Sequence, residues 1–163
     1  IQYKNYELFP DPVIWPVLVH RVLVATRVFA AQLGIDDPEA YTGVHANYYP
    51  DGVSSVMKHT DDELQLVPHA PIFSYTYVQG DSRTLAGDFT IWRMPKGADH
   101  IEGKGNLTSV TLYSGDLLVM QGDMQRYFHH SIEKQSTPVA PRLNFTVRQF
   151  VSKKEAMARA RSS

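Results

Sequence analysis

The chain contains no cysteine, which excludes disulfide bonds and thiolate-bound zinc and leaves His, Asp and Glu as metal ligands. It has no run of ~18 apolar residues, so no transmembrane helix is expected. No signal-peptide pattern is visible either, so we expect an intracellular protein of the cytoplasm or nucleus with no membrane contact. A large excess of one charge is also missing. The formal net charge of −1 differs from the strongly positive charge that is typical of a tight nucleic-acid binder.

What is present is the composition of one globular domain: 163 residues, 43% of them hydrophobic and 20% charged. From about Pro16 to Leu33, apolar residues recur at helical spacing, and Gly34 marks a C-terminal stop. The apolar stripe expected on this helix comprises Leu18, Val22, Ala25, Phe29 and Leu33. We expect the helix to pack on a sheet and to act as a support.

After Asp37 the pattern changes to short strand-like runs separated by turns rich in Gly and Asp. The expected strands are Tyr41–Tyr49, Val53–His59, Pro71–Val78, Asp88–Met94, Leu107–Tyr113, Asp116–Gln121, Gln125–Ile132 and Arg142–Val151. Such strands after one helix predict a mostly β protein with a flanking helix (α+β). Its architecture would be a jelly roll, or double-stranded β-helix, with the N-terminal helix packed on it.

We therefore expect a single domain over residues 1–163. Residues 1–40 would form the N-terminal segment and support helix, 41–151 the jelly-roll core, and 152–163 a basic tail in a frayed helix. The Gly- and Lys-containing stretch at residues 94–106 is expected to be a mobile loop.

Histidines and an aspartate supply candidate metal ligands. In "KHTDDE", His59 and Asp61 are two positions apart, so on one strand they project from the same face. A later strand, "YFHHSI", offers His129 or His130. Two His and one carboxylate form the ligand set of non-haem Fe(II) oxygenases, which leaves coordination positions open. Surface residues would give the same spacing, and at least one of His129 and His130 is expected to be such a residue.

A second pattern, "RLNFTVRQF", alternates strictly. Arg142, Asn144, Thr146 and Arg148 share one face of the expected strand, opposite Leu143, Phe145 and Val147. Buried arginines need anionic partners, and these two would lie ~20 Å apart on an extended strand. A dicarboxylate lying along the strand fits this spacing. In "ANYYPDG", Asn47 and Tyr49 share a face and are candidate donors to the same ligand, although ordinary turn chemistry would explain them as well.

Taken in order, "NYYPDG", "HTDDE", "FHHSI" and "RLNFTVR" are similar to the AlkB family of Fe(II)- and 2-oxoglutarate-dependent dioxygenases, particularly its nucleic-acid-repair branch. The resemblance covers about residues 41–151 and implies the cofactors Fe(II), 2-oxoglutarate and O₂. It implies that the catalytic metal ligands are His59, Asp61 and His130. By the same resemblance, Arg142 and Tyr49 hold the distal carboxylate of 2-oxoglutarate, and the end that chelates iron is held by Arg148, Asn144 and Asn47.

The resemblance further implies oxidative demethylation of N-alkylated bases in DNA or RNA, such as 1-methyladenine or 3-methylcytosine, with release of formaldehyde, succinate and CO₂. Such enzymes act on single strands or on flipped bases. Asp62 occupies the family position that hydrogen-bonds the exocyclic amine of the base, although a solvated or salt-bridged acid is an equal alternative. Tyr3 and Tyr6 are candidates for stacking on the base, in a nucleotide-recognition lid that we expect to be truncated. We expect a monomer.

Two other functions remain open. One is a 2-oxoglutarate-dependent hydroxylase or demethylase of a protein or small molecule, which the modest charge favours and Asp62 disfavours. The other is a catalytically silent jelly-roll binding module with structural His and Arg residues. The complete triad argues against that module, since a silent site has no need of all its ligands.

Overall fold

The computed structural model of the chain describes residues 17–81, 83–94, 107–135 and 140–161. Tyr3 and Tyr6, together with nearly all of the expected loop at residues 94–106, lie outside the described residues. Within the described ranges, no helix is long and apolar enough to cross a membrane.

The elements follow one another much as the sequence predicts. In chain order they are α1 (Val17–Gln32), the 3-10 helix η1 (Pro38–Ala40), β1 (Tyr41–Tyr49), β2 (Val56–His59), β3 (Ile72–Val78), β4 (Leu85–Arg93), β5 (Thr108–Tyr113), β6 (Leu117–Met120), α2 (Met124–Tyr127), β7 (Phe128–Ile132), β8 (Arg142–Gln149) and α3 (Lys153–Ala160). Every expected strand overlaps an observed one.

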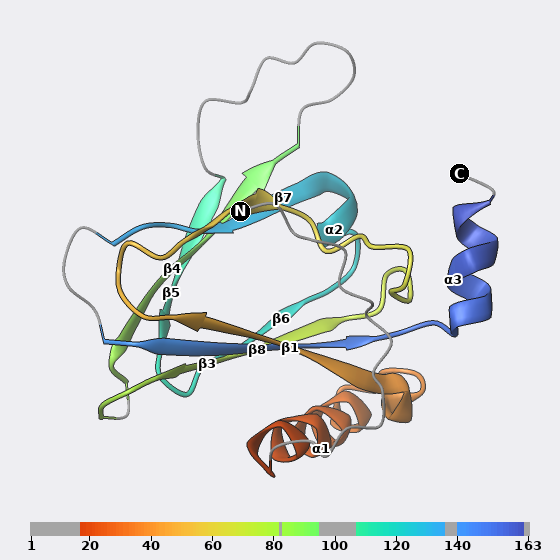
Figure 1. Cartoon of the computed structure of the whole chain (residues 1–163), viewed down its shortest axis with the longest axis horizontal. Helices are drawn as coiled ribbons and strands as arrows, with labels where there is room; N and C mark the ends of the chain where they lie inside the picture. Colours follow the sequence, from red (N-terminus) through yellow and green to blue (C-terminus); the bar gives the residue numbers. More distant parts are fainter. Residues whose placement is uncertain (1–16, 82, 95–106, 136–139, 162–163) are drawn as a thin grey trace.

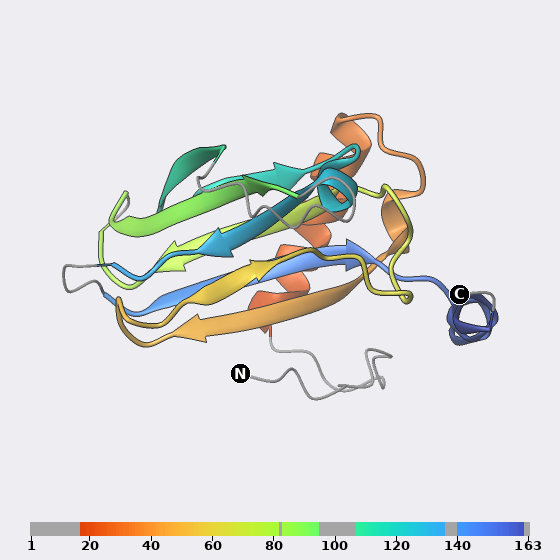
Figure 2. The same ribbon diagram turned by 90° about the horizontal axis from the view of Figure 1, so that it is seen from above.

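The strands form two four-stranded sheets, with the orders β1-β8-β3-β6 and β2-β7-β4-β5. All named strand pairs are antiparallel. We refer to the first as the major sheet and to the second as the minor sheet. Figure 1 shows the two sheets facing each other with α1 under the major sheet, and both strand orders can be followed in Figure 2. The predicted jelly roll with a packed N-terminal helix is therefore confirmed.

Two apolar clusters hold these layers together. The cluster between the sheets is formed by Ile72, Val78, Ala86, Phe89, Leu112 and Met120. The cluster between α1 and the major sheet is formed by Leu23, Ala30, Tyr41, Phe73 and Val147. Full burial of one such large apolar side chain contributes ~1.5–3 kcal/mol. Because Val147 packs toward α1, the alternation of β8 turns its polar residues into the space between the sheets.

The expected apolar stripe on α1 is buried only in part: Val22 packs against the cluster between α1 and the major sheet, but other members of the stripe face outward. Leu23, Thr26 and Ala30 are the buried residues of the helix, whereas Leu18, Phe29 and Leu33 remain 52%, 41% and 61% exposed. The helix is apolar on several sides, so hydrophobic periodicity alone did not identify the buried face. Thr26 is tolerated inside because its hydroxyl donates to the Val22 carbonyl at 2.9 Å and lies 2.9 Å from the Tyr75 hydroxyl.

The strand expected at residues 125–132 begins late. Residues 124–127 form the short helix α2, and β7 starts at Phe128, where pairing with Arg93 of β4 begins. Gly122, with φ +65°, makes the turn before α2, and Met124 then packs against the cluster between the sheets. The basic tail does form a helix, α3. Its first turn is capped by Ser152, whose hydroxyl accepts from the Glu155 N–H at 3.2 Å.

Candidate metal centre and cofactor cradle

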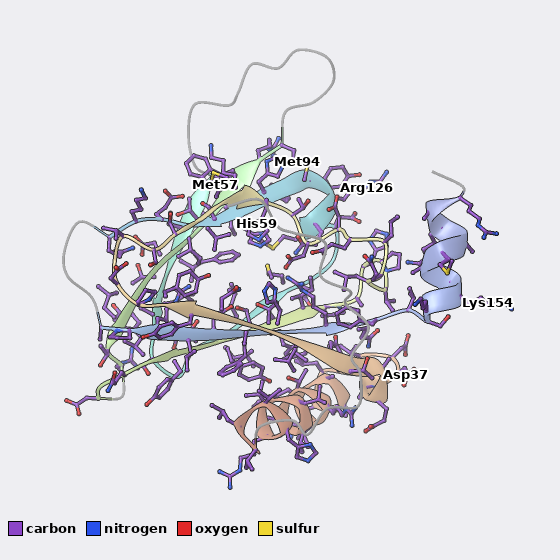
Figure 3. The ribbon with its side chains drawn as sticks, in the orientation of Figure 1. Asp37, Met57, His59, Met94, Arg126 and Lys154 are labelled. Carbon is purple, nitrogen blue, oxygen red and sulfur yellow. The ribbon has the colours of Figure 1, made fainter. Side chains whose placement is uncertain are left out.

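The three predicted metal ligands meet at one point. His59, the last residue of β2, is paired with His130 of β7, and Asp61 follows two residues after His59. The His59 Nε2 atom lies 3.8 Å from Asp61 Oδ1, and the His130 Nε2 atom lies 3.9 Å from Asp61 Oδ2. One ligand atom from each residue falls within 4.8 Å of the other two. Figure 3 shows His59 directed into the space between the sheets.

This arrangement fits a metal ion. Bonds from a metal to imidazole nitrogen or carboxylate oxygen are ~2.0–2.2 Å long, so an ion between these atoms would span the observed gaps. The Nδ1 atom of His59 lies 2.8 Å from the Met57 carbonyl, which can only accept. This contact favours the tautomer with the proton on Nδ1, which presents the Nε2 lone pair to a metal. The donor set of two imidazoles and one carboxylate is that of non-haem Fe(II) centres.

The second imidazole is also available to a metal. Burial is the main factor that lowers the pKa of His130 to about 4, although the Asp61 carboxylate raises it. The ring is therefore neutral at neutral pH and can offer a lone pair. The adjacent His129 lies on the other side of β7, where its Cα partner is Trp92. Of the two candidates in "YFHHSI", the structure brings His130 to the cluster.

Arg148 joins the metal centre to the polar face of β8. Its Nη2 atom donates to Asp61 Oδ1 at 2.6 Å, and its Nη1 atom lies 3.9 Å from Glu63 Oε1. The Arg148 Nε atom is buried and has no hydrogen-bond partner among the described residues. Arg148 thus balances the charge of Asp61 and retains an unused donor beside it.

Gln125 of α2 also holds Asp61 in place, and the sequence did not single it out. Its Oε1 atom accepts from the Asp61 N–H at 2.9 Å, and its Nε2 atom lies 3.6 Å from the Met120 sulfur. Gln125 is remote in the chain from Asp61 and sits in a segment predicted to be a strand. Spacing along the sequence therefore carried no signal for this contact.

Arg142 lies at the opposite end of the same strand face. It is 3% exposed, its Cζ atom lies 4.2 Å from the Tyr49 ring centroid, and Nη1 donates to the Ala86 carbonyl at 3.2 Å. Burial lowers the pKa of Arg142, Tyr49 raises it, and a guanidinium stays charged in proteins. No ion pair joins Arg142 to an acid in the described ranges, and its Nε atom has no partner there. A buried cation without an acidic partner costs several kcal/mol. Tyr49 and the Ala86 carbonyl act on Arg142 but supply no carboxylate, so this end fits the carboxylate of a ligand.

Between the arginines, Asn144 is occupied by the protein itself. Its Nδ2 atom donates to Ser74 Oγ at 2.8 Å and to the Tyr75 carbonyl at 3.0 Å, and its Oδ1 atom accepts from the Thr146 hydroxyl at 3.0 Å. The neighbouring Thr76 hydroxyl is buried without a partner among the described residues. These contacts suit Asn144 to positioning the strand face. They leave the Thr76 hydroxyl of β3, whose Cα partner is Asn144, as a buried polar group that the sequence did not predict.

Strand β1 completes the cradle, which we define as the facing polar residues of β1 and β8. The register pairs His45 with Thr146, Asn47 with Asn144, and Tyr49 with Arg142. Asn47 and Tyr49 share one face of β1, as their spacing predicted, and they lie beside Asn144 and Arg142 of β8. His45 was missed, although its alternation with Asn47 and Tyr49 was a signal for it.

A cavity of about 670 Å³ opens beside the metal centre and shares Asp61 and Arg148 with it. Asp62, Glu63 and Gln125 contribute polar groups to its lining, and the apolar part includes Leu66, Ile72, Met94, Met120 and Met124. Asp62 is exposed at the cavity. Met94 and Arg126 line this cavity together with Asp61. Figure 3 shows Met94, Arg126 and His59 in the upper part of the molecule. This volume is in the range of small-molecule sites, ~300–1,000 Å³.

Comparison with known proteins agrees with this geometry. A family model described as the 2OG-Fe(II) oxygenase superfamily matches residues 3–148. The chain is similar to the DNA oxidative demethylase ALKBH2 of Mus musculus, with 27% identity over 117 residues, 72% of this chain and 46% of that protein. The proteins of the same name from Homo sapiens and Bos taurus are also 27% identical, over 117 and 149 residues. These alignments cover 72% and 91% of this chain, and 42% and 48% of the two relatives. The chain thus spans somewhat less than half the length of these relatives.

Proposed function

The chain belongs to the 2OG-Fe(II) oxygenase superfamily, and from this membership we propose that it oxidatively demethylates N-alkylated nucleobases in DNA or RNA. The relatives named DNA oxidative demethylase agree with the AlkB-like motifs of the sequence. The observation that carries the proposal is a His-Asp-His cluster whose Asp61 also lines a cavity bearing Asp62.

In this proposal, His59, Asp61 and His130 hold Fe(II). Arg142 and Tyr49 hold the distal carboxylate of 2-oxoglutarate, while Arg148 and Asn47 serve the end next to the metal. Asn144 positions the strand through its bonds to Ser74 and Tyr75. When bound, Fe(II), 2-oxoglutarate and O₂ would supply the oxidising power to hydroxylate an N-linked methyl group, which would then leave as formaldehyde. The protein contributes ligands, orientation and a cavity that limits water.

The cavity has features suited to a planar base. Met94, Met120 and Met124 line it, and no Phe, Tyr or Trp is found among the described lining residues. Thioethers make favourable contacts with aromatic rings, worth ~0.3–1.5 kcal/mol each, so the methionines would pack on a base at this place. The Asp62 carboxylate can accept a hydrogen bond from the exocyclic amine of methylated adenine or cytosine. Arg126 also lines the cavity and suits contact with a nucleic-acid phosphate.

The test is succinate release from 2-oxoglutarate and Fe(II), measured with methylated oligonucleotides, the same oligonucleotides without the methyl group, and no oligonucleotide. Oligonucleotides with 1-methyladenine or 3-methylcytosine, as single strands and as duplexes, should stimulate release above both controls. Asp62→Ala should reduce this stimulation roughly 10-fold, the scale of one hydrogen bond to a charged group. Asp81→Ala, on the exposed turn between β3 and β4, is the matched control and should leave it unchanged.

The other functions predict different results. Succinate release that no methylated oligonucleotide stimulates would overturn the nucleobase proposal and leave a hydroxylase or demethylase of a protein or small molecule. Absence of turnover under every condition, with the metal bound, would favour the silent binding module.

A further inference from the structure

His45 lies inside the cradle, although no motif of the sequence includes it. On β1 it alternates with Asn47 and Tyr49, so its side chain leaves the same face of the strand. Its Cα partner on β8 is Thr146, a buried residue of the polar face that also carries Arg142 and Arg148. The ring is partly buried. It therefore faces the space between the sheets.

The strand register places His45 at the metal end of the cradle, because its partner Thr146 is two positions from Arg148 and four from Arg142. The nearby charges agree with this position. Arg148, Asp61 and His59 are the charged or titratable groups that act on the ring. Arg142, which marks the other end, is not among them. His45 is also outside the compact cluster formed by His59, Asp61 and His130. The ring is thus a neighbour of the metal centre and of Arg148 without belonging to the ligand set.

Hydrogen-bond donors are scarce at this end. The Asn144 amide already donates to Ser74 and Tyr75. Arg148 gives its Nη2 donor to Asp61 at 2.6 Å. A carboxylate offers about four lone-pair sites, so a ligand carboxylate here needs further donors besides Asn47 and the Arg148 Nε atom.

We propose that His45 donates a hydrogen bond to the carboxylate of 2-oxoglutarate that lies next to the metal. Among the residues that the structure describes, none forms a hydrogen bond with the His45 ring, so its N–H is available for this contact. The inference depends on the family cofactor and is independent of the nucleobase substrate.

The protonation state of His45 agrees with this role. Burial is the main factor that lowers its pKa, and the Arg148 guanidinium lowers it further. At neutral pH the ring is therefore neutral and has one N–H to donate.

The test uses two variants of nearly equal size. His45→Gln keeps an N–H donor, whereas His45→Met lacks one. Binding of 2-oxoglutarate to the Mn(II)-loaded protein is measured by calorimetry, without oligonucleotide, together with Mn(II) affinity in the absence of 2-oxoglutarate. His45→Met should weaken 2-oxoglutarate binding roughly 10-fold, as expected for one hydrogen bond to a charged group. His45→Gln should keep most of the affinity, and Mn(II) affinity should stay unchanged in both variants.

His129→Met is the matched control, since His129 lies on the other side of β7 from the metal ligand His130. It should bind 2-oxoglutarate like the unmodified protein. Equal 2-oxoglutarate affinity in His45→Met and His45→Gln would overturn the proposal, because the donor would then have no role. A parallel loss of Mn(II) affinity would also overturn it, because His45 would then act as a metal ligand. If the protein binds 2-oxoglutarate as predicted but no methylated oligonucleotide stimulates turnover, the nucleobase proposal is contradicted and the role of His45 is not.

Discussion

Two adjacent histidines on β7 have different surroundings, and this makes the metal assignment testable residue by residue. His130 is 4% exposed and faces Asp61, whereas His129 is paired with Trp92 on the other side of the strand. Mutation of a residue that only hydrogen-bonds to a metal ligand usually lowers metal affinity ~10–100-fold. We predict that loss of a ligand itself, in His130→Ala or His59→Ala, weakens Mn(II) binding on the order of 100-fold or more. His129→Ala should bind Mn(II) normally. Titration calorimetry measures all three, and normal binding by His130→Ala would contradict the assignment.

Gln125 provides a second prediction at the residue scale. Its Oε1 atom accepts from the backbone N–H of Asp61, the buried carboxylate that we propose as a metal ligand. Gln125→Leu removes this acceptor and frees the Asp61 backbone to move, so Mn(II) affinity should fall roughly 10-fold. Gln121→Leu, a change in the same cavity lining, should have little effect. If both variants bound Mn(II) as tightly as the unmodified protein, Gln125 would have no positioning role.

Within β4, a bulge presents the acceptor that holds Arg142. The register with β5 shifts between Leu85 and Gly87, and the Ala86 carbonyl in this bulge accepts from Arg142 Nη1. Gly87 has φ +111°, a conformation that side chains rarely adopt, and an added Cβ would lie 2.8 Å from Gln135 Nε2. We predict that Gly87→Ala lowers stability by ~1–3 kcal/mol and weakens 2-oxoglutarate binding several-fold.

The control for this prediction is Gly115→Ala. Gly115 also has positive φ, +94°, but nothing lies within 4 Å of its added Cβ. Thermal unfolding should show a loss of stability in both variants, while calorimetry should show weaker 2-oxoglutarate binding only in Gly87→Ala. An equal loss of affinity in both would mean that the bulge has no specific part in holding Arg142.

The elements differ in how far the sequence could predict them. Strand alternation and turn residues predicted all the strands and the face of β8 that carries Arg142 and Arg148, because these signals are local. The buried face of α1 was predicted only in part, because the helix is apolar on several sides and its contacts with the major sheet decide which side is buried. The bonds of Asn144 and Gln125 depend on residues far away in the chain, so no local pattern could reveal them.

At the scale of the whole molecule, the site joins the two sheets. His59 and His130 belong to the minor sheet, whereas the cradle residues of β1 and β8 belong to the major sheet. A metal and a diacid bound together would therefore connect the layers that Figure 1 shows facing each other. Their binding should stabilise the fold as a unit.

We predict that Mn(II) with 2-oxoglutarate, at concentrations near 100 times the dissociation constant, stabilises the protein by ~2.7 kcal/mol. For a domain of this size, this corresponds to a rise in melting temperature of roughly 5–10 °C. Differential scanning fluorimetry measures the shift, and His59→Ala should show little of it. An equal shift in His59→Ala would mean that the ligands bind elsewhere.

The most direct test of the central claim is the product formed from a methylated oligonucleotide. The protein is incubated with Fe(II), 2-oxoglutarate, O₂ and an oligonucleotide containing one 1-methyladenine or 3-methylcytosine, and the oligonucleotide mass is measured together with formaldehyde and succinate. We predict loss of one methyl group from the oligonucleotide, with formaldehyde equimolar to the demethylated product and at least as much succinate. Succinate formation from an oligonucleotide that keeps its methyl group, with no formaldehyde, would contradict the claim.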